Sequence, residues 1–174
     1  YTRDVSTPEF MYANSVTPAF KSSLKFYTVG DEIKFTEPGR ILYLRMYVAE
    51  SSPASGYQLS LWEANPDGSG SVRVAMGSIV RTIPGWASVP LTVPYLVSPT
   101  KRYIVSFNVG QKRYPSLQPG VVKFGDATST FVIPVNSYQA TTSNIFFNGT
   151  IVNDNFYTDV VFAPSSEVTT MYRA

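Results

Sequence analysis

The chain has 174 residues, a formal net charge of +2 and neither Cys nor His. It therefore cannot carry a disulfide, a Ser-His-Asp or Cys-His catalytic group, or a zinc site built from those side chains. Only 15% of its residues are charged and they form no dense basic stripe, so we expect no nucleic-acid partner. No apolar run approaches the ~18 residues of a membrane span, and none is expected.

The first 23 residues show no sustained periodicity. Pro8 and Pro18 lie among polar residues there, and the apolar residues Phe10, Met11 and Tyr12 offer anchors. We expect residues 1–23 to form an extended arm that lies on the domain. The alternating patterns described below place that domain at residues 24–163, and residues 164–174 are interpreted as a tail or linker.

Residues 41–49 alternate between apolar and larger polar or aromatic side chains. One phase is wholly apolar: Leu42, Leu44, Met46 and Val48. The opposite phase holds Tyr43, Arg45 and Tyr47. A period of two indicates a strand with one buried face. Residues 29–35, 57–63 and 72–80 are predicted to be strands as well, and turn residues 65–70 separate the last two.

Residues 85–109 carry the clearest period of two in the chain, interrupted at Ser98-Pro99. Pro90 and Pro94 have the same parity, so the donors that they lack would point to one side of the strand, as an edge strand allows. Residues 103–109 form a second apolar phase beyond the turn. We expect the two strands to pair as a hairpin.

The second half of the chain contains further short strands separated by turn residues and a long loop at residues 110–120. The predicted strands are residues 121–124, 130–133, 144–147 and 155–162. About eight to ten short strands without an amphipathic helix are typical of an all-β domain. The expected fold is a single-domain antiparallel β-sandwich, jelly-roll or immunoglobulin-like, with little or no helix.

Five segments, in this order, carry a family resemblance: Arg45-Met46-Tyr47, Leu61-Trp62-Glu63, Gly85-Trp86, residues 103–107 (YIVSF) and residues 155–162 (NFYTDVVF). The pattern resembles a bacterial family known as domain of unknown function four thousand and eighty-two. The resemblance covers about residues 24–162. It implies an extracellular β-sandwich module, often repeated in long surface proteins, and it implies no established activity.

Arg45 and Asp159 each lie in the middle of a predicted strand. A lone charge that is covered at such a position is costly, so a bidentate ion pair between neighbouring strands is the natural arrangement. This hypothesis gives the pair a structural role. It predicts that Asp159→Ala destabilises the domain rather than only silencing a site.

Aromatic side chains are the candidate ligand-binding residues. If residues 41–49 pair with residues 57–63, Tyr43 lies opposite Trp62 and Tyr47 lies near Gln58. Flat rings beside hydrogen-bonding side chains stack on sugar rings, so this face would bind carbohydrate without catalysis. Trp86 and Tyr114, near loops, are further candidates. The alternative is that the arm or another strand covers these rings, as is usual for large aromatics.

Carboxylates and oxygen-rich turns give two weaker hypotheses. Glu63 and Asp159 are the candidates for a glycosidase pair, although a strand carboxylate has many other roles, and we expect no enzyme. No cofactor is expected, with calcium as the exception that the sequence leaves open. Its ligands would come from two turns, through Asn65 and Asp67 and through Asp154, but such turns also form without metal.

These observations favour a non-catalytic module of a larger bacterial surface or secreted protein. The chain begins at Tyr1, without an initiator Met, and we interpret it as part of a longer polypeptide. Low charge and 14% aromatic residues are typical of exported β-domains, so an extracellular or cell-surface location is expected. The expected partners are a glycan or cell-surface polysaccharide and neighbouring domains of the same polypeptide. A structural spacer without ligand is the alternative, and a small jelly-roll glycoside hydrolase the third.

Overall fold

The computed structural model describes residues 8–22, 28–64, 71–108, 113–116, 122–140 and 150–165. The regular structure in these ranges is almost entirely strand: β1 (Ala19–Ser22), β2 (Thr28–Phe35), β3 (Gly39–Val48), β4 (Tyr57–Ala64), β5 (Ser71–Ile79), β6 (Gly85–Val97), β7 (Arg102–Asn108), β8 (Arg113–Ser116), β9 (Val132–Ala140), β10 (Thr150–Val152) and β11 (Thr158–Pro164). The predicted all-β fold is confirmed. In these ranges we find no helix with the length and apolar character needed to traverse a bilayer.

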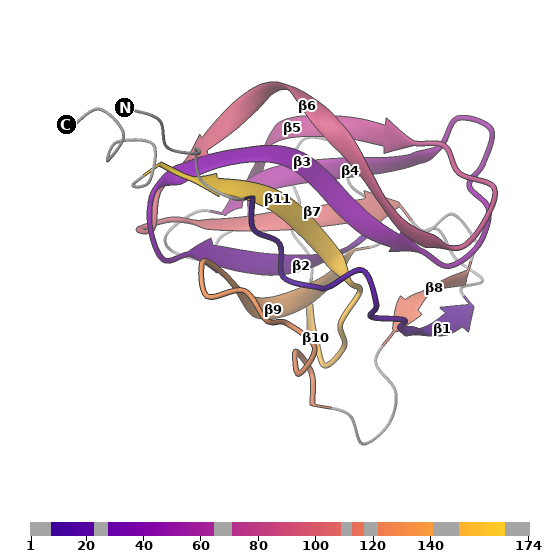
Figure 1. The fold of residues 1–174 in the computed structure, drawn as a ribbon. Helices are drawn as coiled ribbons and strands as arrows, with labels where there is room; N and C mark the ends of the chain where they lie inside the picture. Colours follow the sequence, from indigo (N-terminus) through magenta and orange to yellow (C-terminus); the bar gives the residue numbers. More distant parts are fainter. Residues whose placement is uncertain are drawn as a thin grey trace.

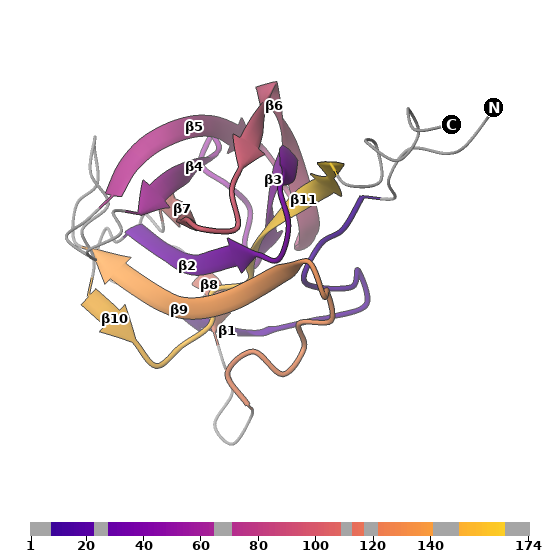
Figure 2. The same cartoon turned by 90° about the vertical axis from the view of Figure 1, so that its left-hand side faces the viewer.

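Two antiparallel sheets face each other as a β-sandwich. The large sheet has the order β10-β9-β2-β7-β4-β5 and the small sheet the order β11-β3-β6, while β1 and β8 form a separate ladder. Figure 2 shows the large sheet curving round the small one. Side chains from the inner faces of both sheets form one core, which includes Leu44 of β3, Leu61 of β4 and Val105 of β7. Burial of these apolar faces is the main stabilising contribution.

Of the two predictions for β6, its edge position is right and its pairing with β7 is wrong. It is an edge strand, as its prolines indicated, because it pairs only with β3 among the described residues. The hairpin with β7 is wrong, since β7 pairs with β2 and β4 in the opposite sheet. The turn at Ser98-Pro99 therefore carries the chain from one layer to the other. Two consecutive strands that each bury one face can pair in the same sheet or lie in two sheets that face each other. Alternation of side chains alone does not distinguish these two arrangements.

Several predicted strand limits need correction. Residues 122–126 form turns rather than part of a strand. Residues 155–157 precede β11, and Tyr157 has a positive φ of 54° there. In β3, a bulge between Ile41 and Tyr43 brings Ile41 fully into the core in place of Leu42. The strand predicted at residues 144–147 lies outside the described residues.

Candidate functional site

The amino-terminal arm is built into the domain rather than resting on its surface. Glu9 exchanges two backbone hydrogen bonds with Phe162 of β11, at 2.7 and 2.8 Å. The Thr128 N–H donates to the Met11 carbonyl at 2.8 Å. Met11 and Tyr12 are fully buried and belong to the main core. The arm thus crosses the outer face of the small sheet and covers the part of it around Arg45 and Asp159.

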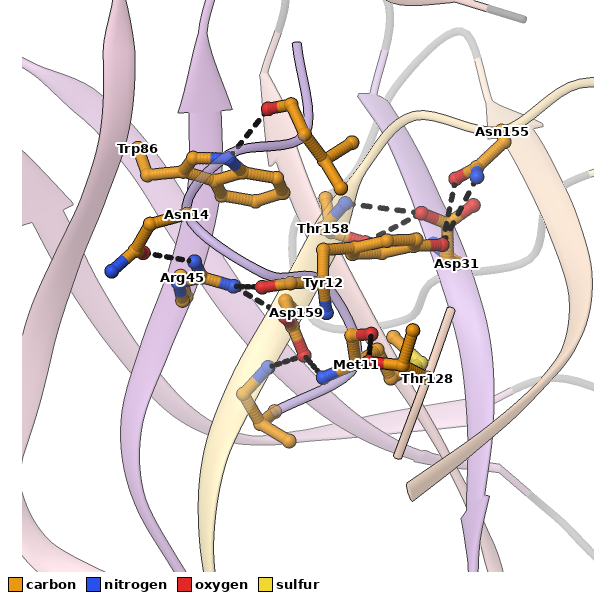
Figure 3. Close-up of polar contacts among 12 residues, drawn as sticks. Met11, Tyr12, Asn14, Asp31, Arg45, Trp86, Thr128, Asn155, Thr158 and Asp159 are labelled. Carbon is orange, nitrogen blue, oxygen red and sulfur yellow. Dashed lines mark hydrogen bonds and ion pairs between the residues drawn. The ribbon is translucent and has the colours of Figure 1, made fainter. Parts of the chain in front are cut away.

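A buried ion pair fixes the arm there (Figure 3). Arg45 of β3 and Asp159 of β11 are opposite residues on neighbouring strands, and Arg45 Nη1 lies 2.7 Å from Asp159 Oδ2. The predicted ion pair is therefore present, although it is not bidentate. Arg45 Nη1 also donates to the Tyr12 carbonyl and Nη2 donates to Asn14 Oδ1, both at 2.7 Å. The guanidinium binds the arm and the carboxylate together.

The carboxylate of Asp159 accepts hydrogen bonds on both oxygens. The Met11 N–H donates to Oδ1 at 3.0 Å and the Tyr12 N–H to Oδ2 at 3.1 Å. The Val160 N–H donates to Oδ1 at 2.7 Å. Burial raises the pKa of Asp159 to about 6, while these N–H groups and Arg45 oppose that rise. At neutral pH the carboxylate is ionised and its negative charge is matched by Arg45.

Asp31 of β2 is a second fully buried carboxyl group, and it lies between the sheets. Its Oδ2 accepts hydrogen bonds from the backbone N–H and the hydroxyl of Thr158, at 3.1 and 3.0 Å. Its Oδ1 lies 2.6 Å from Ser137 Oγ, which also lies 2.6 Å from the Asp154 carbonyl. No described cation lies within ion-pair distance of it. Burial raises the pKa of Asp31 to about 6.

The geometry around Ser137 allows Asp31 to carry a proton. A serine hydroxyl has one hydrogen, and the Asp154 carbonyl oxygen can only accept one. If Ser137 donates to that carbonyl, its short contact with Asp31 Oδ1 is a hydrogen bond only when the carboxyl O–H donates. If Ser137 donates to Asp31 instead, Oδ1 is the acceptor, as it is for the Phe156 N–H at 3.3 Å. Asp31 therefore suits the neutral acid below its pKa of about 6 and the carboxylate above it, whereas the groups around Asp159 can only donate.

The residues before β11 complete the attachment of the arm. Asn155 accepts a hydrogen bond from the Tyr157 N–H at 2.9 Å and donates from Nδ2 to the Tyr12 hydroxyl at 3.0 Å. The first bond supports the positive φ of Tyr157, which is uncommon for a bulky side chain. Sequence reasoning named Tyr12 as an anchor of the arm, but it did not assign Asp31 or find the contacts of Asn155. The position of Asp31 on the apolar phase of its strand, between Val29 and Ile33, was the available signal.

The predicted aromatic face does not form. β3 and β4 belong to different sheets, so Tyr43 and Trp62 are not cross-strand neighbours. Trp62 has 0% exposed surface, and its Nε1 donates to Ser106 Oγ at 2.8 Å. Tyr47 and Tyr114 are each only 8% exposed, whereas Tyr43 is 39% exposed. Three of the five candidate rings are therefore buried and inaccessible to a ligand, because they pack within the domain.

Trp86 occupies an intermediate position. Its ring stacks on that of Tyr12, with centroids 5.8 Å apart and planes inclined by 18°. The Arg45 guanidinium carbon lies 4.0 Å from the ring centroid, and Trp86 Nε1 donates to the Val16 carbonyl at 2.9 Å. The indole is thus fixed by the arm but remains partly exposed.

The exposed part of Trp86 lines a groove of about 480 Å³ between the end of β5 and the start of β6. The lining residues come from both strands and the segment after β5: Ser78, Ile79, Val80, Arg81, Trp86, Ala87, Ser88, Val89 and Pro90. Its volume falls in the range of small-molecule sites, about 300–1,000 Å³. The groove joins an aromatic ring, a guanidinium and two hydroxyl groups.

The two carboxylates considered for glycoside hydrolysis are not brought together. Glu63 lies on β4 of the large sheet, where Lys101 Nζ is 2.9 Å from Oε1 and the Tyr95 hydroxyl donates to Oε2 at 2.7 Å. Hydrogen bonding by Lys101 and Tyr95 lowers the pKa of Glu63. Asp159 is buried under the arm on the small sheet. Among the described residues they share no hydrogen-bond or ion-pair partner, and neither lines the groove.

The metal hypothesis gains no support. Asn65 and Asp67 lie outside the described residues. The Asp154 carboxylate accepts hydrogen bonds from the Ser116 hydroxyl and the Asn155 N–H, and Lys21 Nζ lies 3.6 Å from it. Across the ranges that the structure describes, no group of three or more acidic side chains is arranged to hold a metal ion.

The five segments of the resemblance meet at two places. Arg45, Trp86 and the residues from Asn155 to Asp159 surround the arm, whereas Trp62 and Ser106 join on the outer face of the large sheet. A family model described as "Domain of unknown function (DUF4082)" matches residues 15–158. No curated protein matches the chain.

Proposed function

The chain belongs to the DUF4082 family, a domain of unknown function, and we propose that it is a non-catalytic module of a larger surface or secreted protein that binds carbohydrate. The proposed site is the groove at Trp86. The observation that carries the proposal is that this one candidate ring, fixed by the arm, forms a wall of a groove together with hydrogen-bonding side chains.

The groove has the features that sugar recognition requires. A held indole offers an apolar surface to the C–H groups of a pyranose ring, at little cost in conformational entropy. Ser78 and Ser88 on the two flanking strands offer hydroxyl groups for the polar edge of the ring. A non-catalytic role is supported by the separation of Glu63 from Asp159, because the carboxylate pair considered for glycoside hydrolysis does not face a common site.

A structural spacer is the second candidate, and the arm favours it. Tyr47, Trp62 and Tyr114 are buried, so most of the rings considered for recognition instead contribute to packing. An arm bound through a buried ion pair gives a firm amino-terminal attachment, which suits a domain that positions its neighbours.

A glycan-array screen of the chain, with calcium and with EDTA, tests the proposal. We expect binding by the unmodified chain, loss in Trp86→Phe and retention in Tyr43→Ala, which removes an exposed ring of β3 that does not itself line the groove. Circular dichroism checks that both variants are folded. Loss only in Tyr43→Ala would place recognition on the face of β3 instead. Absence of binding to every glycan would favour the spacer.

A further inference from the structure

The charged residues of the two strands that form the groove are all positive. Residues 71–97, which contain β5 and β6, include Arg73 and Arg81 but no Asp or Glu. Of the groove's lining residues, Arg81 alone is charged. A concave site with one sign of charge attracts ligands of the opposite sign.

Arg81 is held in place by its own loop. Its Nε donates to the Ile83 carbonyl at 2.7 Å and its Nη2 to the Pro84 carbonyl at 3.3 Å. Gly85, with a φ of +143°, allows this approach, since a Cβ there would lie 2.6 Å from Arg81 Nη2. The backbone of Arg81 is held by Ser52, whose N–H donates to the Arg81 carbonyl at 2.9 Å and whose hydroxyl accepts from the Arg81 N–H at 3.1 Å.

The guanidinium keeps donors for a ligand. It carries five N–H groups in a planar fork, and the two carbonyls take one from Nε and one from Nη2. The edge formed by Nη1 and Nη2 is the geometry that binds a carboxylate through two parallel hydrogen bonds. No described carboxylate lies within ion-pair distance of Arg81.

The walls of the groove present complementary groups. Trp86 is held by Tyr12, Arg45 and the Val16 carbonyl. Pro90 is exposed four residues further along β6 and has no backbone N–H to donate. Ser78 and Ser88 are exposed on opposite sides, and in the described part of the chain their hydroxyls have no hydrogen-bond partner. An apolar wall, free hydroxyls and a fixed cation therefore meet in one cavity.

We infer that the groove binds an acidic saccharide through a uronate unit, with its carboxylate on Arg81 and its ring against Trp86. This inference rests on the proposed function and narrows it to one class of sugar. Because Arg81 is already oriented, little conformational entropy is lost when the carboxylate binds.

Affinity electrophoresis tests this with alginate and polygalacturonate as uronates, heparin as a sulfated polymer and dextran as a neutral one. Arg81→Gln removes the charge but keeps amide donors for the loop carbonyls. Arg73→Gln is the matched control, because it removes the same charge from β5 outside the groove. We expect both uronates to bind, Arg81→Gln to weaken them at least tenfold and Arg73→Gln to change them less than twofold.

A second variant, Ser88→Trp, fills the groove without altering charge and should abolish uronate binding while the melting temperature stays within a few degrees. Equal weakening by both arginine variants would indicate diffuse electrostatic attraction and overturn the inference, as would preference for heparin over both uronates. Binding of dextran that is unaffected by Arg81→Gln would leave carbohydrate binding standing but refute the acidic ligand. Absence of binding to all four polymers would refute both.

Discussion

Asp159 and Asp31 are both fully buried, yet the domain surrounds them differently. Asp159 lies on the outer face of the small sheet, where three backbone N–H groups and Arg45 donate to its two oxygens. Asp31 lies between the sheets, where the Ser137 hydroxyl, 2.6 Å from Oδ1, can either donate to the carboxylate or accept from the protonated acid. The groups around Asp159 can therefore only donate, whereas one group beside Asp31 can do both.

The difference shows how the arm is attached. A charge buried without a partner is unfavourable, but Asp159 and Arg45 neutralise each other and bind backbone groups of the arm that have no strand partner. Asp31 binds no part of the arm; it joins β2 to the start of β11 through Thr158 and to β9 through Ser137. Asp159 therefore fixes the arm on the small sheet, whereas Asp31 connects strands inside the sandwich.

The largest expected effect is that of Asp159→Asn. The amide would direct an N–H toward groups that also donate and would leave Arg45 without its counter-charge. We expect a loss of about 3–5 kcal/mol in the free energy of unfolding, measured by chemical denaturation. Glu63→Gln, which alters an ion pair with the exposed Lys101, is the control and should change stability by less than about 1 kcal/mol. Equal effects would contradict the role of the buried pair.

Mild acid is expected to stabilise the domain. A carboxyl group whose pKa rises on folding from 3.8 to about 6, as for Asp31, binds its proton more tightly in the folded state. Its contribution is fully present below pH 3.8 and is lost as the pH rises through 6. It amounts to about 3 kcal/mol in full and about half of that at pH 5. Asp159 acts in the same direction. Denaturation at pH 7.5 and pH 5 measures the change, and lower stability at pH 5 would contradict it.

Ser137→Ala removes the hydroxyl that joins Asp31 to the Asp154 carbonyl. Both groups would lose a partner in a buried place, so we expect a loss of about 1–3 kcal/mol in the free energy of unfolding. Ser88→Ala, at an exposed position, serves as the matched control and should leave thermal stability unchanged. If Ser137→Ala left the free energy of unfolding unchanged, water or another group would have to replace the hydroxyl.

Asp31→Asn should have the smallest effect. The amide oxygen can accept from Thr158 while the amide N–H donates to Ser137, so only the long hydrogen bond from the Phe156 N–H, at 3.3 Å, is lost. We expect a change in stability below about 1 kcal/mol at pH 7 and a weaker rise in stability at pH 5. A loss as large as that of Asp159→Asn would show that Asp31 is needed as a charge.

Sequence patterns identified some tertiary features and missed others for physical reasons. The pairing of Arg45 with Asp159 was predictable because two opposite charges in mid-strand have few other stable arrangements. Met11 and Tyr12 were expected as anchors of the arm, but the hydrogen bonds that fix it were not predictable, since they involve its backbone, which leaves no periodic signal. The groove was also missed, because its walls come from edge strands of two different sheets.

The sequence by itself determined that the chain forms short strands with one apolar face each, and hence a sandwich, because side-chain alternation is a local property of extended backbone. Only the tertiary structure decided which strands are neighbours, which aromatic rings are covered and where a groove remains. The reason is that hydrophobic burial has no direction and is satisfied by any partner that excludes water. Hydrogen bonds and charges with specific geometry, such as those of Asp159, then select among the partners.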